Sequence, residues 1–173
     1  MKKDDNKVLR VRDHEGNMQD IKQLNPEDAR ETLGVFQSAN GSEKAQVKKL
    51  TKKAQEWVGN IRKSGLRPDE ARCAIDSTIG KTLLYCLPAT AMTQGECQEI
   101  HKKFLVGALP KTRIVRTASR KLVFAPLKIL GFGFVDLERT QLADHIIRLL
   151  DHGTENTVTG KLIRIAGEGT SIE

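Results

Sequence analysis

Apolar positions in this sequence recur with two different periods, and the change falls in its N-terminal quarter. Residues 7–12 and 18–24 mix apolar and charged side chains in rough alternation, on either side of the turn-forming segment 13–17. This pattern predicts a β-hairpin with a loop of about 4–5 residues. Residues 31–37 have the composition of a third strand, in which Gly34 marks a bulge or a close backbone approach.

The rest of the chain has apolar residues at helical spacing. A helix is predicted over 43–64, a second over 68–87, and a third that opens with the capping box Thr93–Glu96. A fourth helix begins after Asp136, which caps it. The first helix has the clearest apolar stripe, formed by Val47, Leu50, Ala54, Trp57, Val58 and Ile61.

These elements predict an α+β protein with a small N-terminal antiparallel sheet and a mostly helical subdomain. We place the β-region at 1–41 and the helical region at 42–152, and we expect a polar, loosely ordered tail at 153–173. Within the helical region, residues 110–136 have no helical period and are expected to be irregular.

Composition adds a moderate basic charge. The 173 residues include 29 Lys and Arg against 22 Asp and Glu, a formal net charge of +7. Such a chain suits a polyanionic partner such as nucleic acid, although many soluble proteins are equally basic. Aromatic residues make up only 4%, which argues against single-strand binding by base stacking.

The cysteines and the apolar runs bear on the compartment. Three cysteines without a close Cys-x-x-Cys pair indicate free thiols and a reducing compartment. No apolar run approaches the length of about 20 residues that spans a bilayer. We therefore expect no membrane partner, and an intracellular protein, cytoplasmic or nuclear.

Candidate catalytic and metal-binding groups are few. Cys97 and His101 stand four residues apart on a predicted helix, but no second ligand pair has suitable spacing. Asp4 and Asp5 lie among lysines near the N-terminus, where a solvated charge run is expected. Gly131-x-Gly133 matches only half of a dinucleotide-binding motif. The sequence therefore predicts no metal, no cofactor and no catalytic residue in this chain.

The lysine-rich first helix is the strongest functional signal. It carries seven cations: Lys44, Lys48, Lys49, Lys52, Lys53, Arg62 and Lys63. Several cations along one face suit the phosphates of a nucleic acid, which need little geometric precision. A face that is merely solvated remains the alternative.

Several short motifs follow one another between residues 8 and 152. They are Thr32-Leu-Gly-Val35 with Asn40-Gly41, Ala54-x-x-Trp57, Leu84-Tyr85-x-Leu87-Pro88, Leu109-Pro110-Lys111, Gly131-x-Gly133 with Asp136-Leu137, and Gln141 with His145. In this order they resemble the reverse transcriptases of non-long-terminal-repeat, LINE-like retrotransposons, in the region downstream of the polymerase active site.

The resemblance implies a primer-grip hairpin at the Leu-Gly-Val motif, followed by the thumb and a connector. It places no aromatic-x-Asp-Asp magnesium box in this sequence, so the chain is expected to be a fragment or relic of an RNA-directed DNA polymerase that is inactive alone. Magnesium would belong to the missing palm, and the remaining polymerase subdomains, on a longer chain, would be partners. The residues expected to hold template–primer duplex are Leu33, Gly34, Val35, Lys48, Lys49, Lys52, Lys53, Arg113, Arg116 and Arg120.

Two other classes of function remain open. One is a non-catalytic helical scaffold that binds a protein, and the other is an enzyme with unfamiliar chemistry. Basic side chains that converge on one concave face would favour nucleic acid, whereas scattered basic side chains would favour the scaffold.

Overall fold

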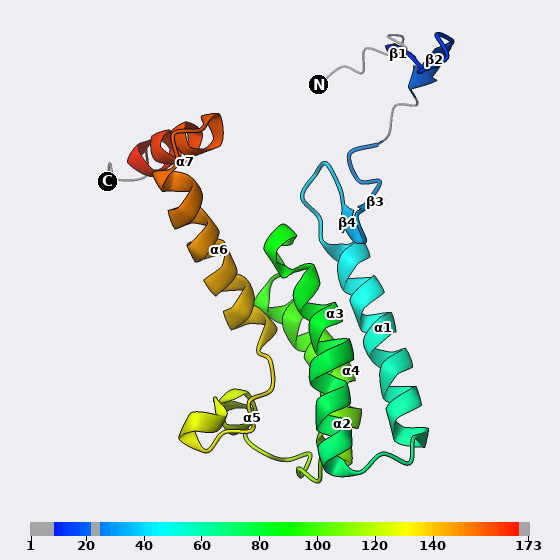
Figure 1. The fold of residues 1–173 in the computed structure, drawn as a ribbon, viewed down its shortest axis with the longest axis vertical. Helices are drawn as coiled ribbons and strands as arrows, with labels where there is room; N and C mark the ends of the chain where they lie inside the picture. Colours follow the sequence, from blue (N-terminus) through cyan, green and yellow to red (C-terminus); the bar gives the residue numbers. More distant parts are fainter. Residues whose placement is uncertain (1–8, 22–24, 170–173) are drawn as a thin grey trace.

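The computed structural model describes residues 9–21 and 25–169. Its four strands are all N-terminal and form two separate two-stranded antiparallel sheets, and the elements that follow are helical. This arrangement confirms the predicted α+β class. Figure 1 shows the strands at the N-terminal end with α1 to α5 below them, while α6 and α7 rise on the other side.

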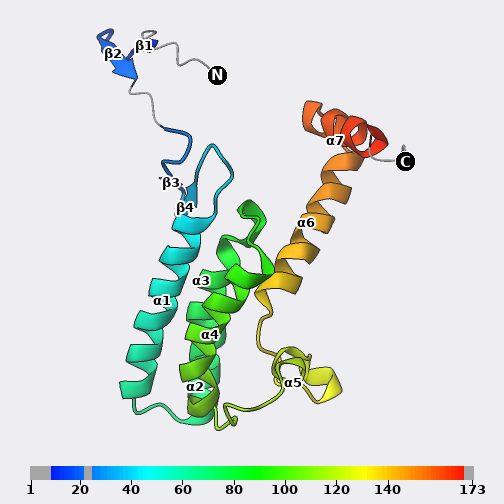
Figure 2. The same ribbon diagram turned by 180° about the vertical axis from the view of Figure 1, so that it is seen from behind.

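The first hairpin pairs β1 (Leu9–Arg12) with β2 (Met18–Ile21). Its turn is stabilised by the Asp13 carboxylate, which accepts the backbone N–H groups of Glu15 and Asn17 at 3.0 and 2.9 Å. The predicted hairpin is therefore confirmed over residues 9–21, and the predicted strand residues 7–8 and 22–24 lie outside the described chain. The hairpin stands apart from the helices in both ribbon views (Figures 1 and 2).

The second hairpin replaces the single strand predicted over 31–37, so that prediction was wrong. β3 (Arg30–Thr32) pairs with β4 (Val35–Gln37), and Leu33 and Gly34 form the turn between them. Their φ angles are +50° and +84°. Two successive residues with positive φ make the type I′ turn that joins adjacent antiparallel strands.

Helices α1 (Lys44–Lys63) and α4 (Gln94–Lys111) pack against each other and form the centre of the core. The predicted stripe of α1 is buried except at Trp57, which is half-buried. The Trp57 indole N–H donates to the hydroxyl of Thr78 at 3.0 Å, and its ring packs on Phe104 at 5.8 Å between centroids.

The helix predicted over 68–87 forms with an irregular middle turn. α2 (Pro68–Ala74) continues through a π-helical turn, η1 (Ile75–Ile79), into α3 (Gly80–Tyr85), and a 3₁₀ turn, η2 (Leu87–Ala89), follows. The π-helical turn keeps Ile75 and Ile79 in the core.

The predicted caps of α4 and α6 are confirmed. The Glu96 carboxylate accepts the Thr93 backbone N–H at 2.8 Å, and the Thr93 hydroxyl accepts the Glu96 N–H at 3.4 Å. Helix α6 (Leu137–Thr154) begins with Asp136, whose carboxylate accepts the Arg139 N–H at 3.4 Å. Each side chain satisfies an N–H group that the helix itself leaves unpaired.

Residues 110–136 are more regular than predicted. α4 extends beyond Pro110 to Lys111, and the segment then contains α5 (Arg120–Phe124) and the 3₁₀ turn η3 (Leu127–Ile129).

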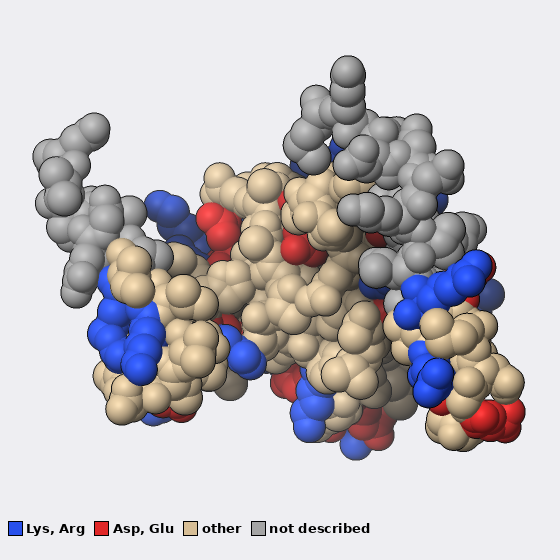
Figure 3. Space-filling model, turned by 90° about the horizontal axis from the view of Figure 1, so that it is seen from above, with Lys and Arg blue, Asp and Glu red and all other residues tan. Residues whose placement is uncertain are grey.

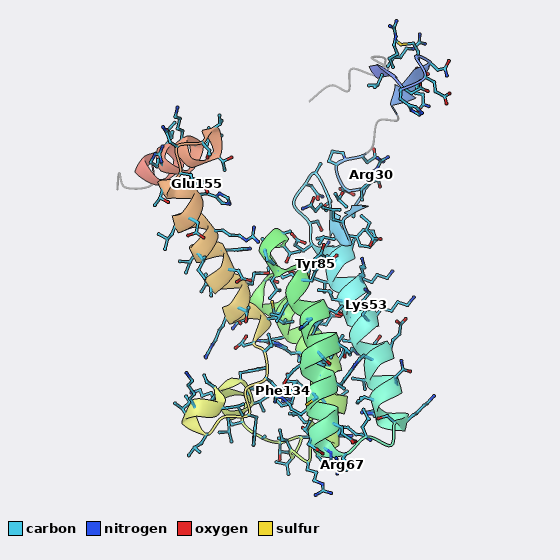
Figure 4. All side chains as sticks on the ribbon, in the orientation of Figure 1. Arg30, Lys53, Arg67, Tyr85, Phe134 and Glu155 are labelled. Atoms are coloured by element: carbon cyan, nitrogen blue, oxygen red, sulfur yellow. The ribbon has the colours of Figure 1, made fainter. Side chains whose placement is uncertain are left out.

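Arg72 of α2 fastens this segment to the core. Its guanidinium donates to the carbonyls of Phe132 and Gly133 at 2.6 and 2.8 Å, and it lies 4.4 Å from the centroid of the Phe134 ring. Figure 4 shows Phe134 between α5 and α2.

The C-terminal part of α6 projects from the bundle (Figures 1 and 2). Its predicted apolar face is buried only at Leu137 and Gln141, while Ile146, Ile147 and Leu150 are about half exposed, at 48%, 55% and 62%. The reason is that the bundle contacts only the first turns of this helix.

Residues 158–169 form helix α7 (Val158–Gly169), where the sequence predicted a loosely ordered tail. The Thr157 hydroxyl accepts the Gly160 N–H at 3.1 Å, and the Arg164 guanidinium donates to the Gly153 carbonyl at 2.6 Å. The first contact caps the start of α7, and the second docks α7 on the end of α6. Residues 170–173 of the predicted tail lie outside the described chain.

Helices α1 and α4 are in tight contact at Gly107, where an added Cβ would lie 2.5 Å from Val58 Cγ1. We expect Gly107→Ala to destabilise the protein by about 1–3 kcal/mol, because a packed core must shift to accommodate it. Denaturant unfolding measures the change. Gly59→Ala is the control, because no atom lies within 4 Å of its added Cβ.

A second variant tests whether the loss of stability in Gly107→Ala comes from its contact with Val58. Val58→Ala removes the methyl groups that the added Cβ of Gly107→Ala would meet, so the double variant should lose less stability than the two single losses added together. Strictly additive losses would show that the helices do not meet at this point.

The Leu33-Gly34 turn offers a test of the second hairpin. Asn adopts a positive φ with less strain than Leu, and Asn-Gly is the preferred pair in a type I′ turn. Leu33→Asn should therefore raise the free energy of unfolding by about 1 kcal/mol, whereas the β-branched Leu33→Val should lower it. Equal urea midpoints for both variants would contradict the turn.

Candidate nucleic-acid interface

The β3–β4 hairpin is docked on α1 and α3 by several polar contacts. The Tyr85 hydroxyl donates to the Leu33 carbonyl at 2.8 Å, and the Phe36 N–H donates to the Gln46 side chain at 2.9 Å. Lys49 donates to the Gly34 carbonyl at 2.7 Å. The hairpin is therefore held against α1 and α3, while the tip of its turn remains exposed.

The three residues predicted at this motif have different surroundings. Leu33 is 85% exposed at the tip of the turn, while Val35 is 6% exposed and belongs to the core. Gly34 contributes its backbone to a surface groove. Only Leu33 and Gly34 are accessible to a ligand, and Val35 anchors the hairpin from below.

Lys49 is engaged within the protein. Besides the Gly34 carbonyl, it forms an ion pair with Glu31, and its ammonium lies 5.2 Å from the centroid of the Phe36 ring. Its side chain is only 20% exposed. Lys49 therefore stabilises the hairpin and adds positive charge beneath the turn.

Lys53 lines the same groove as Lys49, together with Lys81 of α3, Tyr85 and Gly34. The groove has a volume of about 420 Å³. Figure 4 shows Lys53 and Tyr85 on the neighbouring helices α1 and α3. We call this surface the turn groove. Three lysines line it, and so does one carboxylate, that of Glu31.

Lys48 and Lys52 lie on a different side of α1. With Lys44 they line a groove of about 460 Å³, and Glu96 and Glu99 of α4 line it as well. Lys52 also lies 3.8 Å from Glu56. The nearby carboxylates offset the lysine charge, so this groove is a weaker site for phosphate than the turn groove.

The three predicted arginines lie far from the turn. Arg113 and Arg116 are exposed in the connection between α4 and α5, and Arg120 begins α5. Arg120 lines a third groove, between α4, α5 and the start of α6. Figure 3 likewise shows Lys and Arg in separate groups on the face it presents. The ten predicted residues thus do not converge on one surface.

The sequence interpretation missed Lys81 and Tyr85. They are four residues apart on α3, so both face α1 one turn from each other. The motif containing Tyr85 was noted, but a single lysine in a mostly apolar helix gave no signal of its own.

His101 is buried and holds the start of α6. Its Nε2 accepts the Leu137 N–H at 3.2 Å, and its ring packs against Phe124 with 4.7 Å between centroids. Burial lowers the pKa of His101, opposed in part by the Asp136 charge. The imidazole is therefore neutral and serves as a hydrogen-bond acceptor.

Cys97 and His101 do not form a metal pair of the kind considered from the sequence. His101 uses Nε2 for the Leu137 N–H, and burial raises the pKa of Cys97 to about 11. No group of three metal-ligating side chains occurs within residues 9–21 and 25–169. Asp4 and Asp5 lie outside that range.

Comparison with known proteins gives no match. No protein-family model matches the chain, and no curated protein or solved structure is significantly similar to it. Among the described helices, none is long and apolar enough to cross a membrane.

Acidification should destabilise the protein through His101. The unfolded chain takes up a proton near the ordinary pKa of 6.5, whereas the folded state resists it because its pKa is lower. Stability should therefore be constant above that pH and fall as the pH drops below it. Denaturant unfolding at several pH values between 8 and 5 measures the effect.

The variant His101→Gln should flatten this dependence, since Gln does not titrate. His152→Gln is the control, because His152 is half exposed at the end of α6. An unchanged pH dependence in His101→Gln would assign the effect to other groups.

Proposed function

We propose that this chain is the template–primer-gripping part of a protein related to the reverse transcriptases of LINE-like retrotransposons. In this role it holds a nucleic-acid duplex by its backbone and carries no polymerase chemistry itself. The observation that supports the proposal best is the turn groove, which is lined by Gly34 of the β3–β4 turn and by Lys49, Lys53 and Lys81, and in which Lys49 donates to the Gly34 carbonyl.

The residues of the turn groove have separate roles in this proposal. Lys53 and Lys81 form no ion pair among the described residues, so both are available for phosphate oxygens. Lys49 holds the turn in place. The exposed Leu33 side chain contacts the sugar or base at the end of the duplex.

Binding of this kind is sequence-independent and weak. Phosphate contacts carry no base information, and non-specific affinities are about 10⁻⁴ to 10⁻⁶ M in physiological salt. The described lysines and arginines are spread over several surfaces, so one duplex contacts only a few of them. We therefore expect a dissociation constant near the weak end of this range, at about 10⁻⁴ M.

A salt titration on an RNA–DNA hybrid duplex tests the proposal. Lys53→Gln/Lys81→Gln should weaken binding and reduce the slope of log affinity against log salt by up to nearly two units, since each lost phosphate contact removes about 0.9. Fluorescence anisotropy of a labelled duplex measures affinity at each salt concentration. Denaturant unfolding checks that the variant remains folded.

Lys103→Gln/Lys128→Gln is the matched control. It removes the same charge from two exposed lysines outside the turn groove, so it should change the slope little. Equal slopes for wild type and both variants, with folding intact, would refute the proposal.

A protein-interaction module is the second candidate. Two observations favour it: the predicted basic residues do not converge, and the projecting part of α6 presents an apolar surface. That surface contains Leu142, Ile146, Leu149 and Leu150, which are between 48% and 62% exposed. Refutation of duplex binding would make this candidate the leading one.

A further inference from the structure

The third groove has no part in the proposed duplex grip. It lies between α4, α5 and the start of α6, and has a volume of about 490 Å³, within the usual range of small-molecule sites. It shares no lining residue with the turn groove. We call it the α4–α5 groove.

Its rim is rich in unpaired positive charge. Lys102 of α4 and Arg120 and Lys121 of α5 all line it, and none of the three is ion-paired within the described chain. A fourth cation, Arg139, lies 3.4 Å from Asp136 and is already neutralised. Glu138 is the other carboxylate at the groove. The cations therefore exceed the carboxylates, and those on α5 are free to bind an anion.

Its floor is apolar and aromatic. Leu105 is buried there, and the half-buried Phe124 ring packs against the neutral His101 ring. Gln94 and Gln98 line the groove from α4, and both are exposed. Their amides can donate and accept hydrogen bonds. The groove thus combines an aromatic surface, amide groups and cations, which a flat aromatic molecule with a phosphate would use together.

The wall that carries the α5 cations is fixed in position. The Phe132 and Phe134 N–H groups donate to the carbonyls of Leu122 and Val123 at 2.9 and 3.0 Å. Arg72 fastens the same segment to α2, as described above. The groove is therefore preformed, so a ligand does not have to order it.

We propose that the α4–α5 groove binds a nucleotide, with its phosphate at Lys102, Arg120 and Lys121 and its base over Leu105 and Phe124. The nucleotide is either a free molecule or the unpaired end of a strand. The second source depends on the proposed duplex grip, whereas the first does not.

Calorimetric titrations of the whole chain test the proposal. The probes are adenosine 5′-monophosphate, ribose 5-phosphate, inorganic phosphate and a peptide of glutamates. Adenosine monophosphate should bind at least about tenfold more tightly than the other three, because only it offers both a base and a phosphate. Equal binding of ribose phosphate or phosphate, or tighter binding of the acidic peptide, would overturn the proposal.

Variants locate the site. Arg120→Gln/Lys121→Gln should weaken nucleotide binding about tenfold or more. Both side chains are exposed, so folding should be retained, and denaturant unfolding checks this. Phe124→Leu should weaken the monophosphate but not ribose phosphate. The control Lys103→Gln/Lys128→Gln should change neither. Nucleotide affinity that Arg120→Gln/Lys121→Gln leaves unchanged would overturn the assignment.

A last comparison separates the two sources of the nucleotide and the two proposals. If the monophosphate does not bind, a hybrid duplex with a single-stranded overhang should bind more tightly than the blunt duplex, and Arg120→Gln/Lys121→Gln should remove the difference. If neither the monophosphate nor the overhang is bound, the groove proposal fails. A different result would refute the duplex grip: the affinity for the blunt duplex would be the same in wild type and in Lys53→Gln/Lys81→Gln.

Discussion

The packing of α1 against α4 is the contact on which the other surfaces depend. Toward the C-terminal ends of both helices, Gly107 has no side chain, and the methyl groups of Val58 fill the space beside it. This brings the two helix axes close together and buries the α1 stripe. α4 also contacts α2 and α6, so its position sets where α3 stands beside α1 and where α5 and α6 begin. A shift between α1 and α4 would therefore alter the turn groove and the α4–α5 groove together.

A run of lysines along a helix does not by itself make a basic surface. Because a helix turns about 100° per residue, Lys48 and Lys52 face one side of α1 and Lys49 and Lys53 the next. The neighbouring element then decides the charge of each groove. Glu96 and Glu99 of α4 offset the first pair, while Lys81 of α3 adds to the second. The difference between the two grooves arises from tertiary packing, which the spacing of lysines in the sequence does not contain.

Features that depend on local sequence could be predicted. The α1 stripe, the Thr93–Glu96 capping box and the Asp136 cap each follow from residues a few positions apart, and all three are present. The residue pattern over 31–37 predicted one strand and missed the second hairpin, which only the family resemblance implied. Leu rarely adopts positive φ, so Leu33-Gly34 lacks the usual Asn-Gly signature of its turn. Helix α7 was missed for another reason: it is held against the end of α6 by the Arg164 guanidinium, which donates to the Gly153 carbonyl, 11 residues away in sequence. The sequence found the candidate cations of α1 but not their partners from other elements.

Few cations near the turn are free to bind phosphate, and this limits the affinity of the proposed duplex grip. Of the predicted residues at the turn, Val35 belongs to the core and Lys49 holds the hairpin. Lys53 and Lys81 remain for phosphate, and each phosphate contact adds affinity that salt weakens. In the proposed duplex grip, a surface with so few free cations would hold a duplex only briefly. The α4–α5 groove differs because its cations surround an aromatic floor, and burial of a base there would give affinity that salt affects less.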